Sequence, residues 1–432
     1  MKKDSLSEGR HVYVVDGCRT PFLRAKGVGP FSASDLAVAT GQALLNRQPF
    51  LPSALDQVII GSAMPGPDEA NIARIIALRL GCGNHVPAFT VMRNCASGMQ
   101  ALDNAAMEIA AGRSELILAG GTEAMSHAPI LFNERMADWL ARWSTSKGYG
   151  QRFNTLMEFR LSFLVPVIAL LRGLTDPLIG INMGQTAEIL AYRFGISRTE
   201  MDTFAVQSHQ RLQAAYTKGW MDEVVPLIDK KGNVYLQDDG LRPDSSIEKL
   251  AKLKPVFDKK FGTVTAGNSS QITDGACLLV LASADAVKKY KLPVLGRIVD
   301  TQWAALNPEQ MGLGPVHAAT PILQRHHLKP TDFDCWEINE AFAAQVLACL
   351  RAWDDAEYCY EQLGLSKPMG GPHPDILNQD GGAIAVGHPI GASGARIVLH
   401  VLQSLKHRQG KRGMASICIG GGQGGAMYLE RG

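Results

Sequence analysis

Two stretches far apart in the chain carry the same succession of motifs, and this internal repeat strongly limits the possible folds. In each copy, an Ala-Ser-Gly tripeptide precedes a helical pattern, an apolar strand and a run of glycines; the copies span 96–121 and 392–422. Upstream of each lies an acidic residue, a short apolar strand and a small-residue turn, at 56–64 and 334–342. Strands that alternate with helices are typical of α/β layers with largely parallel strands. The sequence therefore predicts an α/β fold with two related halves.

The repeat also predicts how the chain divides. A length of 432 residues suggests two or three domains at about 150 residues each. The repeat instead favours two halves, 1–287 and 288–432, with a boundary in the segment before a new strand at 294–299. The first half also holds a long stretch, about 127–266, that has no counterpart in the second half.

Composition excludes several classes of protein. Lys plus Arg number 43 and Asp plus Glu 41. This balance argues against a nucleic-acid binder, which usually has a strongly basic face. No run of 18 apolar residues is present, so no segment is expected to span a membrane. The first twenty residues lack the apolar region of a signal peptide, and two acidic residues there disfavour a transit peptide, so we expect a cytoplasmic protein. The eight cysteines include no C-x-x-C pair, which disfavours a zinc ribbon or a thioredoxin motif.

Cys95 is the first candidate for chemistry. It follows an apolar strand pattern at 88–92 and precedes an alanine-rich helix with small residues at its start. A thiol at a helix N-terminus feels the positive end of the helix dipole, which stabilises the thiolate. The position predicts a nucleophile, with a buried structural cysteine as the alternative.

His388 is the second candidate. It lies in a turn of glycines and small residues, G-G-A-I-A-V-G-H-P-I-G-A-S-G at 381–394, in which Pro389 fixes the following backbone. Because Ala-Ser-Gly follows both Cys95 and His388, the repeat predicts that the two lie in equivalent places near a shared interface. A histidine beside a cysteine is a common way to activate a thiol. A core histidine in a loop is the alternative.

Two further segments can supply polar groups. Cys418 ends the last strand, before the glycine-rich turn 420–425, and such a turn exposes the N–H groups that an oxyanion or phosphate site requires. No G-x-x-x-x-G-K-[ST] motif is present and the turn does not open a βαβ unit, which disfavours a nucleotide loop. Asn339 follows a predicted strand, where its amide can hold a water or a carbonyl oxygen or can cap a helix.

With these residues in place, the sequence resembles the thiolase family over about 12–430. Its four catalytic blocks are matched by N-C-A-S-G-M-Q-A (94–101), N-E-A-F (339–342), G-H-P-I-G-A-S-G (387–394) and C-I-G-G-G-Q-G (418–424). R-T-P-F (19–22), G-G-T-E-A-M-S (120–126) and G-T-V-T-A-G-N-S-S-Q-I-T-D-G-A (262–276) also fit, the last as the block beside the coenzyme A pantetheine.

The resemblance implies a thiolase fold: duplicated βαβαβαββ halves in five αβαβα layers, with a loop domain inserted in the first half. It implies that Cys95 is the acylated nucleophile, that His388 takes its proton, and that Cys418 is the acid/base at carbon. The backbone N–H groups of Cys95 and Gly420 would form one oxyanion hole, and Asn339 would hold a water in the other.

The implied co-substrate is coenzyme A, with Ser270 touching its pantetheine and with no permanently bound cofactor and no metal. A polarisable nucleophile and a thiol acid/base meet the needs of 3-ketoacyl cleavage without either. The lysines that crowd 249–260 would suit the phosphates of coenzyme A or form a solvated face.

The implied function is a degradative 3-ketoacyl-CoA thiolase of fatty-acid β-oxidation that acts by ping-pong transfer through an acyl-cysteine. The alternatives are a biosynthetic acetoacetyl-CoA thiolase, a more distant ketoacyl synthase, and a non-catalytic thiolase-like carrier or scaffold. One departure from the family pattern is Asn182, in N-M-G-Q-T-A-E, where many thiolases have a histidine that lies near the substrate.

The inserted segment suggests partners. The apolar stretch 161–171, together with Phe261, is similar to β-oxidation thiolases that pair with a hydratase/dehydrogenase chain. This resemblance implies a homodimer within a heterotetramer, with peripheral membrane contact through 127–180 as a further possibility. From the residues alone, 161–171 is expected to be a buried or subunit-facing helix, or else a surface helix that meets a partner or a membrane.

Overall fold

The computed structural model describes residues 10–432, and its elements follow the predicted repeat. The first half contributes strands β1 (Val12–Arg19), β2 (Leu23–Arg24), β3 (Gln57–Gly61), β4 (Ala88–Val91), β5 (Leu116–Ala124) and β10 (Thr273–Ser283). Its helices are α1 (Ala33–Leu45), α2 (Ile72–Arg79), α3 (Ser97–Ala110) and α10 (Ala284–Tyr290).

The second half contributes fewer strands to the large sheet. Its strands are β11 (Gly296–Ala305), β12 (Cys335–Ile338), β13 (Arg412–Ile419) and β14 (Gln423–Glu430). Its helices are α11 (Gly314–Arg325), α12 (Ala343–Asp354), α13 (Ala356–Leu363), α14 (Ala383–Val386) and α15 (Ile390–Arg408).

Strand pairing confirms the duplication. In the first half, β3 is parallel to β4 and β5, β5 is antiparallel to β10, and β10 is antiparallel to β1. The second half repeats this order: β12 is parallel to β13, β13 is antiparallel to β14, and β14 is antiparallel to β11. Where β4 stands in the first half, the second has a single parallel bridge between Trp336 and Leu377. The halves join through β1 and β11.

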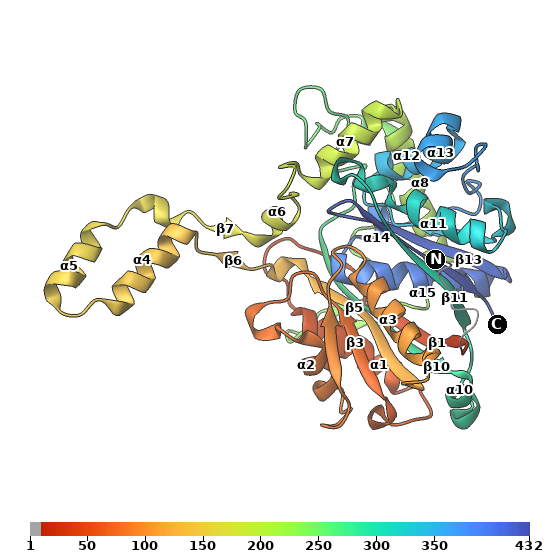
Figure 1. Ribbon diagram of the computed structural model, residues 1–432, viewed down its shortest axis with the longest axis horizontal. Coiled ribbons are helices and arrows are strands. Elements are labelled where there is room, and N and C mark those ends of the chain that lie inside the picture. Colours follow the sequence, from red (N-terminus) through yellow and green to blue (C-terminus); the bar gives the residue numbers. More distant parts are fainter. Residues whose placement is uncertain (1–9) are drawn as a thin grey trace.

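The elements stack as alternating layers around two central helices (Figure 1). Helices α3 and α15 pack against each other between the halves of the sheet, and their buried faces form one apolar core with it. Helices α1, α2 and α10 cover the outer face of the first half, and α11 and α12 cover that of the second, each with a core of its own. The predicted α/β fold with five layers is confirmed.

Glycines allow the central layer to close. A Cβ at Gly98 of α3 would lie 2.9 Å from the backbone N of Ala395 in α15, and one at Gly394 would lie 2.6 Å from the N of Met99. The two Ala-Ser-Gly copies therefore meet at the crossing of α3 and α15. At Gly121 of β5 the approach is closer still, since a Cβ there would lie 2.0 Å from the carbonyl oxygen of Gly391.

We expect Gly121→Ala to destabilise the protein, because the added methyl group has rigid backbone in its place. Overpacking of this kind typically costs about 1–3 kcal/mol and sometimes more. Gly150→Ala is a matched control, because a Cβ at Gly150 in the arm described below meets no atom within 4 Å. Thermal unfolding of both variants tests this; equal midpoints for Gly121→Ala and wild type would contradict the tight crossing.

The insertion has two parts. One packs on the second half and comprises α7 (Met183–Arg193), α8 (Arg198–Thr217) and α9 (Ile247–Leu250); the short pair β8 (Leu227–Ile228) and β9 (Val234–Tyr235) lies between α8 and α9 along the chain. The other is an arm that extends away from the layered body (Figure 1). The arm comprises β6 (Ile130–Leu131), α4 (Glu134–Thr145), α5 (Tyr149–Met157), β7 (Val167–Ile168) and α6 (Ala169–Gly173).

The expectation of a single helix over 161–171 is wrong. The stretch is a 3-10 turn (Leu161–Leu164), the strand β7 and the start of α6, because Pro166 interrupts it. The expectation that it is buried also fails within this chain, where the Leu161 side chain is 80% exposed and those of Val165 and Leu171 are also exposed. Across residues 10–432, no helix is both long and apolar enough to cross a bilayer.

Candidate active site

Cys95 lies in the tight turn between β4 and α3. Asn94 has a φ of 44°, a left-handed conformation that asparagine tolerates better than most residues. The Ser97 hydroxyl braces the turn, because it accepts from the N–H of Arg93 at 2.9 Å and donates to the carbonyl of Asn94 at 2.7 Å. The Asn94 amide then donates to the carbonyl of Gly420 at 2.9 Å. This bond ties the Cys95 turn to the glycine-rich turn of the other half.

The backbone N–H groups of Cys95 and Gly420 both act to lower the pKa of the Cys95 thiol. These are the two donors that the resemblance assigns to an oxyanion hole. Burial nevertheless raises the pKa of the Cys95 thiol, although both N–H groups act to lower it. In the free protein, loss of hydration therefore outweighs the groups that stabilise the thiolate. A nucleophilic Cys95 needs a proton acceptor.

His388 has the tautomer that such an acceptor needs. Its Nδ1 lies 2.6 Å from the hydroxyl of Ser393, and that hydroxyl donates its proton to the carbonyl of Pro389 at 2.9 Å. The hydroxyl therefore accepts from Nδ1–H, which leaves Nε2 with a free lone pair. Within the described chain Nε2 has no hydrogen-bond partner. Burial and the charge of Arg396 lower the pKa of His388 to about 3, so the ring is neutral.

Backbone constraints shape the turn before His388. Gly387 has a φ of 112°, and a Cβ there would lie 2.6 Å from the side chain of Thr273. Glycine is thus required at this position. The N–H of His388 donates to the carbonyl of Gln271 at 3.1 Å, which fixes the ring between α14 and α15.

Cys418 is buried near the end of β13, where it pairs with Gly424 of β14. Burial raises the pKa of its thiol, and the charge of Cys95 raises it further, so the two sulfurs lie in one electrostatic environment. The turn after it passes through left-handed glycines at Gly421 and Gly422. The C-terminal half thereby brings Cys418 and the Gly420 N–H to Cys95.

Asn339 follows β12 and is fully buried. Its N–H donates to the carbonyl of Ser416 at 2.9 Å, which fixes it beside β13. Its side-chain oxygen accepts from Arg396 at 3.3 Å, whereas its amide NH₂ has no partner among the residues that the structure describes. A buried donor in this state is suited to a water or a substrate oxygen.

Ser270 lies close to the Asn339 segment. Its N–H donates to the carbonyl of Ala341 at 2.9 Å, and its side chain is partly exposed. Because the adjacent Gln271 accepts from the His388 N–H, this segment bridges the Asn339 and His388 turns. A partly exposed hydroxyl at this place is compatible with contact to a ligand.

Two site-supporting residues escaped the sequence analysis. Ser393 sets the His388 tautomer. In the repeat it corresponds to Ser97, which braces the Cys95 turn, so the repeat could have pointed to Ser393. Glu123 is a buried carboxylate that accepts from the N–H groups of Ala63, Met64 and Gly391. Burial raises its pKa to about 7. Its signals were its place at the end of an apolar strand and in the block G-G-T-E-A-M-S, neither of which assigned it a role.

The departure at Asn182 has a structural explanation. Its side chain caps α7 by accepting from the N–H of Gln185 at 2.9 Å, and the Gln185 side chain accepts from the Asn182 N–H. Asparagine is among the best N-cap residues. The following residue, Met183, contacts the glycine-rich turn 420–425, because its sulfur would lie 3.1 Å from a Cβ placed on Gly420. Asn182 therefore positions Met183 against the site.

The remaining cysteines are structural. Each is buried and, in the described part of the chain, outside any disulfide: Cys18, Cys82, Cys277, Cys335, Cys349 and Cys359. The lysines at 249–260 are all exposed, as a solvated face requires.

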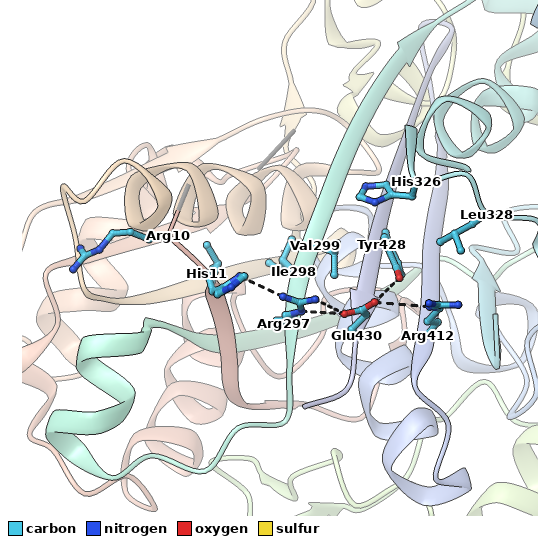
Figure 2. A pocket seen from close by; sticks show the side chains of 11 residues that line it. Arg10, His11, Arg297, Ile298, Val299, His326, Leu328, Arg412, Tyr428 and Glu430 are labelled. Carbon is cyan, nitrogen blue, oxygen red and sulfur yellow. Dashed lines mark hydrogen bonds and ion pairs between the residues drawn. The ribbon is translucent and has the colours of Figure 1, made fainter. Parts of the chain in front are cut away.

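A cavity of about 400 Å³ lies elsewhere, along β1, β11 and β14 (Figure 2). None of the predicted site residues lines it. In it, Arg297 and the Tyr428 hydroxyl donate to Glu430, and Arg412 forms an ion pair with Glu430 at 3.8 Å. It is separate from the candidate active site.

Comparisons with known proteins agree with this geometry. Models of the thiolase N-terminal and C-terminal domains match residues 12–285 and 292–431. The chain is 40% identical to the beta-ketoadipyl-CoA thiolase of Pseudomonas knackmussii, with 98% of this chain and 99% of that protein covered. It is 35% identical to the human mitochondrial trifunctional enzyme subunit beta, with 98% and 88% covered. The crystal structure of human mitochondrial 3-ketoacyl-CoA thiolase in complex with CoA superposes with a TM-score of 0.86 at 37% identity and covers all of both chains. The chain belongs to the thiolase family, and it has the fold and the acyltransferase class of that family.

Proposed function

We propose that this protein is a 3-ketoacyl-CoA thiolase that cleaves 3-ketoacyl-CoA with coenzyme A to acetyl-CoA and a shortened acyl-CoA in fatty-acid β-oxidation. The observation that carries the proposal is the convergence on Cys95. The N–H groups of Cys95 and Gly420 act on the pKa of the Cys95 thiol, and Cys95 acts on that of Cys418. In the same half as Cys418, His388 is neutral, and within residues 10–432 its Nε2 and the Asn339 NH₂ have no hydrogen-bond partner.

The first half-reaction uses Cys95, His388 and Cys418. The Cys95 thiol gives its proton to Nε2 of His388, and the sulfur attacks C3 of the substrate. The C2–C3 bond breaks, its electron pair forms the enolate of acetyl-CoA, and the Cys418 thiol protonates the enolate carbon. The products are acetyl-CoA, an acyl thioester on Cys95, a Cys418 thiolate and a protonated His388.

The second half-reaction returns Cys95, His388 and Cys418 to their starting protonation states. The Cys418 thiolate takes the proton of incoming coenzyme A, whose sulfur attacks the acyl thioester. The Cys95–acyl bond breaks, and the Cys95 sulfur recovers its proton from His388. The N–H groups of Cys95 and Gly420 stabilise the oxygen of one intermediate, and a water on Asn339 together with His388 stabilises the other thioester oxygen.

Coenzyme A enters as a co-substrate, and the chemistry requires no permanently bound cofactor and no metal. We assign its pantetheine to the segment that contains Ser270, because this segment joins the Asn339 and His388 turns. We also infer a boundary between the two thiolase halves at 287/288, close to the junction of the two matched family domains.

The relative at 40% identity favours a second candidate substrate, β-ketoadipyl-CoA. The two substrates differ in chemistry, because a dicarboxylic acyl chain carries a terminal charge and a fatty-acyl chain does not. The biosynthetic alternative instead condenses two acetyl-CoA molecules. A carrier without catalysis does not fit the convergence on Cys95.

A substrate panel separates these candidates. We expect kcat/KM for 3-ketoacyl-CoA to rise from C4 to C16 and to exceed that for β-ketoadipyl-CoA. Preference for β-ketoadipyl-CoA, or turnover confined to acetoacetyl-CoA, would replace the proposal with one of the alternatives.

We further propose that the protein forms a homodimer within a heterotetramer with a hydratase/dehydrogenase chain, and that the arm contributes to docking. The matched trifunctional enzyme subunit beta supports a complex with other subunits. The arm presents exposed apolar side chains beside basic ones; the apolar set is Ile130, Leu131, Phe132, Leu140, Tyr149, Phe153, Leu156, Met157, Leu161, Leu164, Val165, Ile168 and Leu171.

Removal of the arm tests this docking role. Because β6 pairs with β7 through Ile130–Ile168 and Leu131–Val167, residues 132–166 can be replaced by an Asn-Gly hairpin turn. We expect recovery of the complex with a co-expressed hydratase/dehydrogenase chain to fall about tenfold, equivalent to about 1.4 kcal/mol, with turnover of C4 substrates retained. Flotation with anionic vesicles tests membrane contact in parallel. Unchanged recovery of the complex would refute the docking role.

A further inference from the structure

Arg396 is a buried charged residue that the mechanism above does not use. It lies in α15, two turns after His388, with 2% of its surface exposed. One end of its guanidinium donates to the carboxylate of Glu337 in β12, and the other donates to the side-chain oxygen of Asn339 at 3.3 Å. Glu337 and Asn339 are also buried. The Arg396–Glu337 ion pair thus lies beside the side-chain oxygen of Asn339.

The chemistry of guanidinium determines which way this amide faces. Arginine has five donors and no acceptor, so only the oxygen of Asn339 can face it. The planar amide then directs its NH₂ to the other side. This NH₂ is the group that has no partner within residues 10–432, as a donor reserved for a water or a substrate oxygen would be. In the flipped orientation the two donors would meet, and an acceptor would face the oxyanion.

We propose that Arg396, anchored by Glu337, is a positioning residue that holds Asn339 with its NH₂ group directed into the active site. This inference rests on the proposed function, in which Asn339 binds the water of an oxyanion hole.

A double-mutant cycle tests the proposal. The variant Arg396→Gln/Glu337→Gln removes both charges together, so that neither is left buried alone, and glutamine accepts as well as donates. We expect kcat for thiolysis to fall about 10- to 100-fold with little change in KM, since loss of one oxyanion donor typically costs about 100- to 1,000-fold. Asn339→Ala should lower kcat at least as much. Adding Asn339→Ala to Arg396→Gln/Glu337→Gln should lower kcat no further than Asn339→Ala alone, because Arg396 acts through Asn339.

The outcomes are distinct. Losses that multiply in the combined variant, or a folded Arg396→Gln/Glu337→Gln with wild-type kcat, would overturn the positioning role. An Asn339→Ala variant as active as wild type would instead overturn the proposed role of Asn339 itself. If the neutral pair did not fold, Arg396→Lys would carry the same cycle: lysine is also donor-only but shorter, so we expect about a fivefold loss with Asn339 present and none with Asn339→Ala.

Discussion

Replacing Cys95 with serine is expected to lower thiolysis of 3-ketoacyl-CoA by about 10,000-fold or more, since loss of the nucleophile removes the covalent route. The serine fits the same turn, because the braces from Ser97 and Asn94 do not involve the sulfur. Its hydroxyl is far less acidic than a thiol, so transfer of its proton to His388 is much less favourable. Steady-state assays with circular dichroism measure the effect.

Cys349→Ser is the matched control. Its thiol is also buried and donates to the carbonyl of Gly312 at 3.2 Å, a bond that a hydroxyl can replace. We expect this variant to retain turnover per folded molecule. Thiolysis by a folded Cys95→Ser within tenfold of wild type would mean that another residue attacks the substrate.

Replacing Cys418 with alanine should lower thiolysis by about 100- to 10,000-fold, the usual range for loss of an acid/base. The variant should be unable to transfer a proton to or from the acetyl-CoA methyl carbon. Exchange of the acetyl-CoA methyl protons with D₂O should therefore be lost. Because Cys418 acts on the substrate and not on the nucleophile, Cys95 should still react with iodoacetamide. Proton NMR of acetyl-CoA and mass spectrometry of the Cys95 peptide measure the two steps separately.

Cys359→Ala provides the comparison, since it also deletes a fully buried thiol, away from Cys95. It should exchange methyl protons normally. Persistent exchange in a folded Cys418→Ala variant would assign the carbon acid/base to a different group.

The central elements could be predicted from the sequence because their signals are local. Helix α15 and strand β13 match the helical pattern and the apolar strand of the second copy of the repeat, and they extend over Ile390–Arg408 and Arg412–Ile419. Strand β5 runs further than its apolar run, through Gly120 and Gly121 to Ala124, because β10 pairs along its whole length. That pairing comes from a segment about 150 residues later, which no local pattern reveals.

The features that sequence analysis missed depend on contacts across the fold. The pKa of Cys95 rises because the two halves enclose its sulfur, an effect that a helix-terminus argument omits. The stretch 161–171 contains the proline that breaks it, but its exposure follows from the projection of the arm, where this chain offers no core to cover it. The role of Arg396 depends on Glu337 and Asn339, which lie more than fifty residues away in sequence.

Trapping of the acyl-enzyme is the most direct test of the central claim, that Cys95 carries the acyl group between two half-reactions. Wild-type protein is mixed with a C16 3-ketoacyl-CoA in the absence of coenzyme A, and its peptides are analysed by mass spectrometry. The account predicts one equivalent of acetyl-CoA released per chain and a C14 acyl group on the peptide that contains Cys95. Release of acetyl-CoA without this adduct, or an adduct on a different residue, would contradict it.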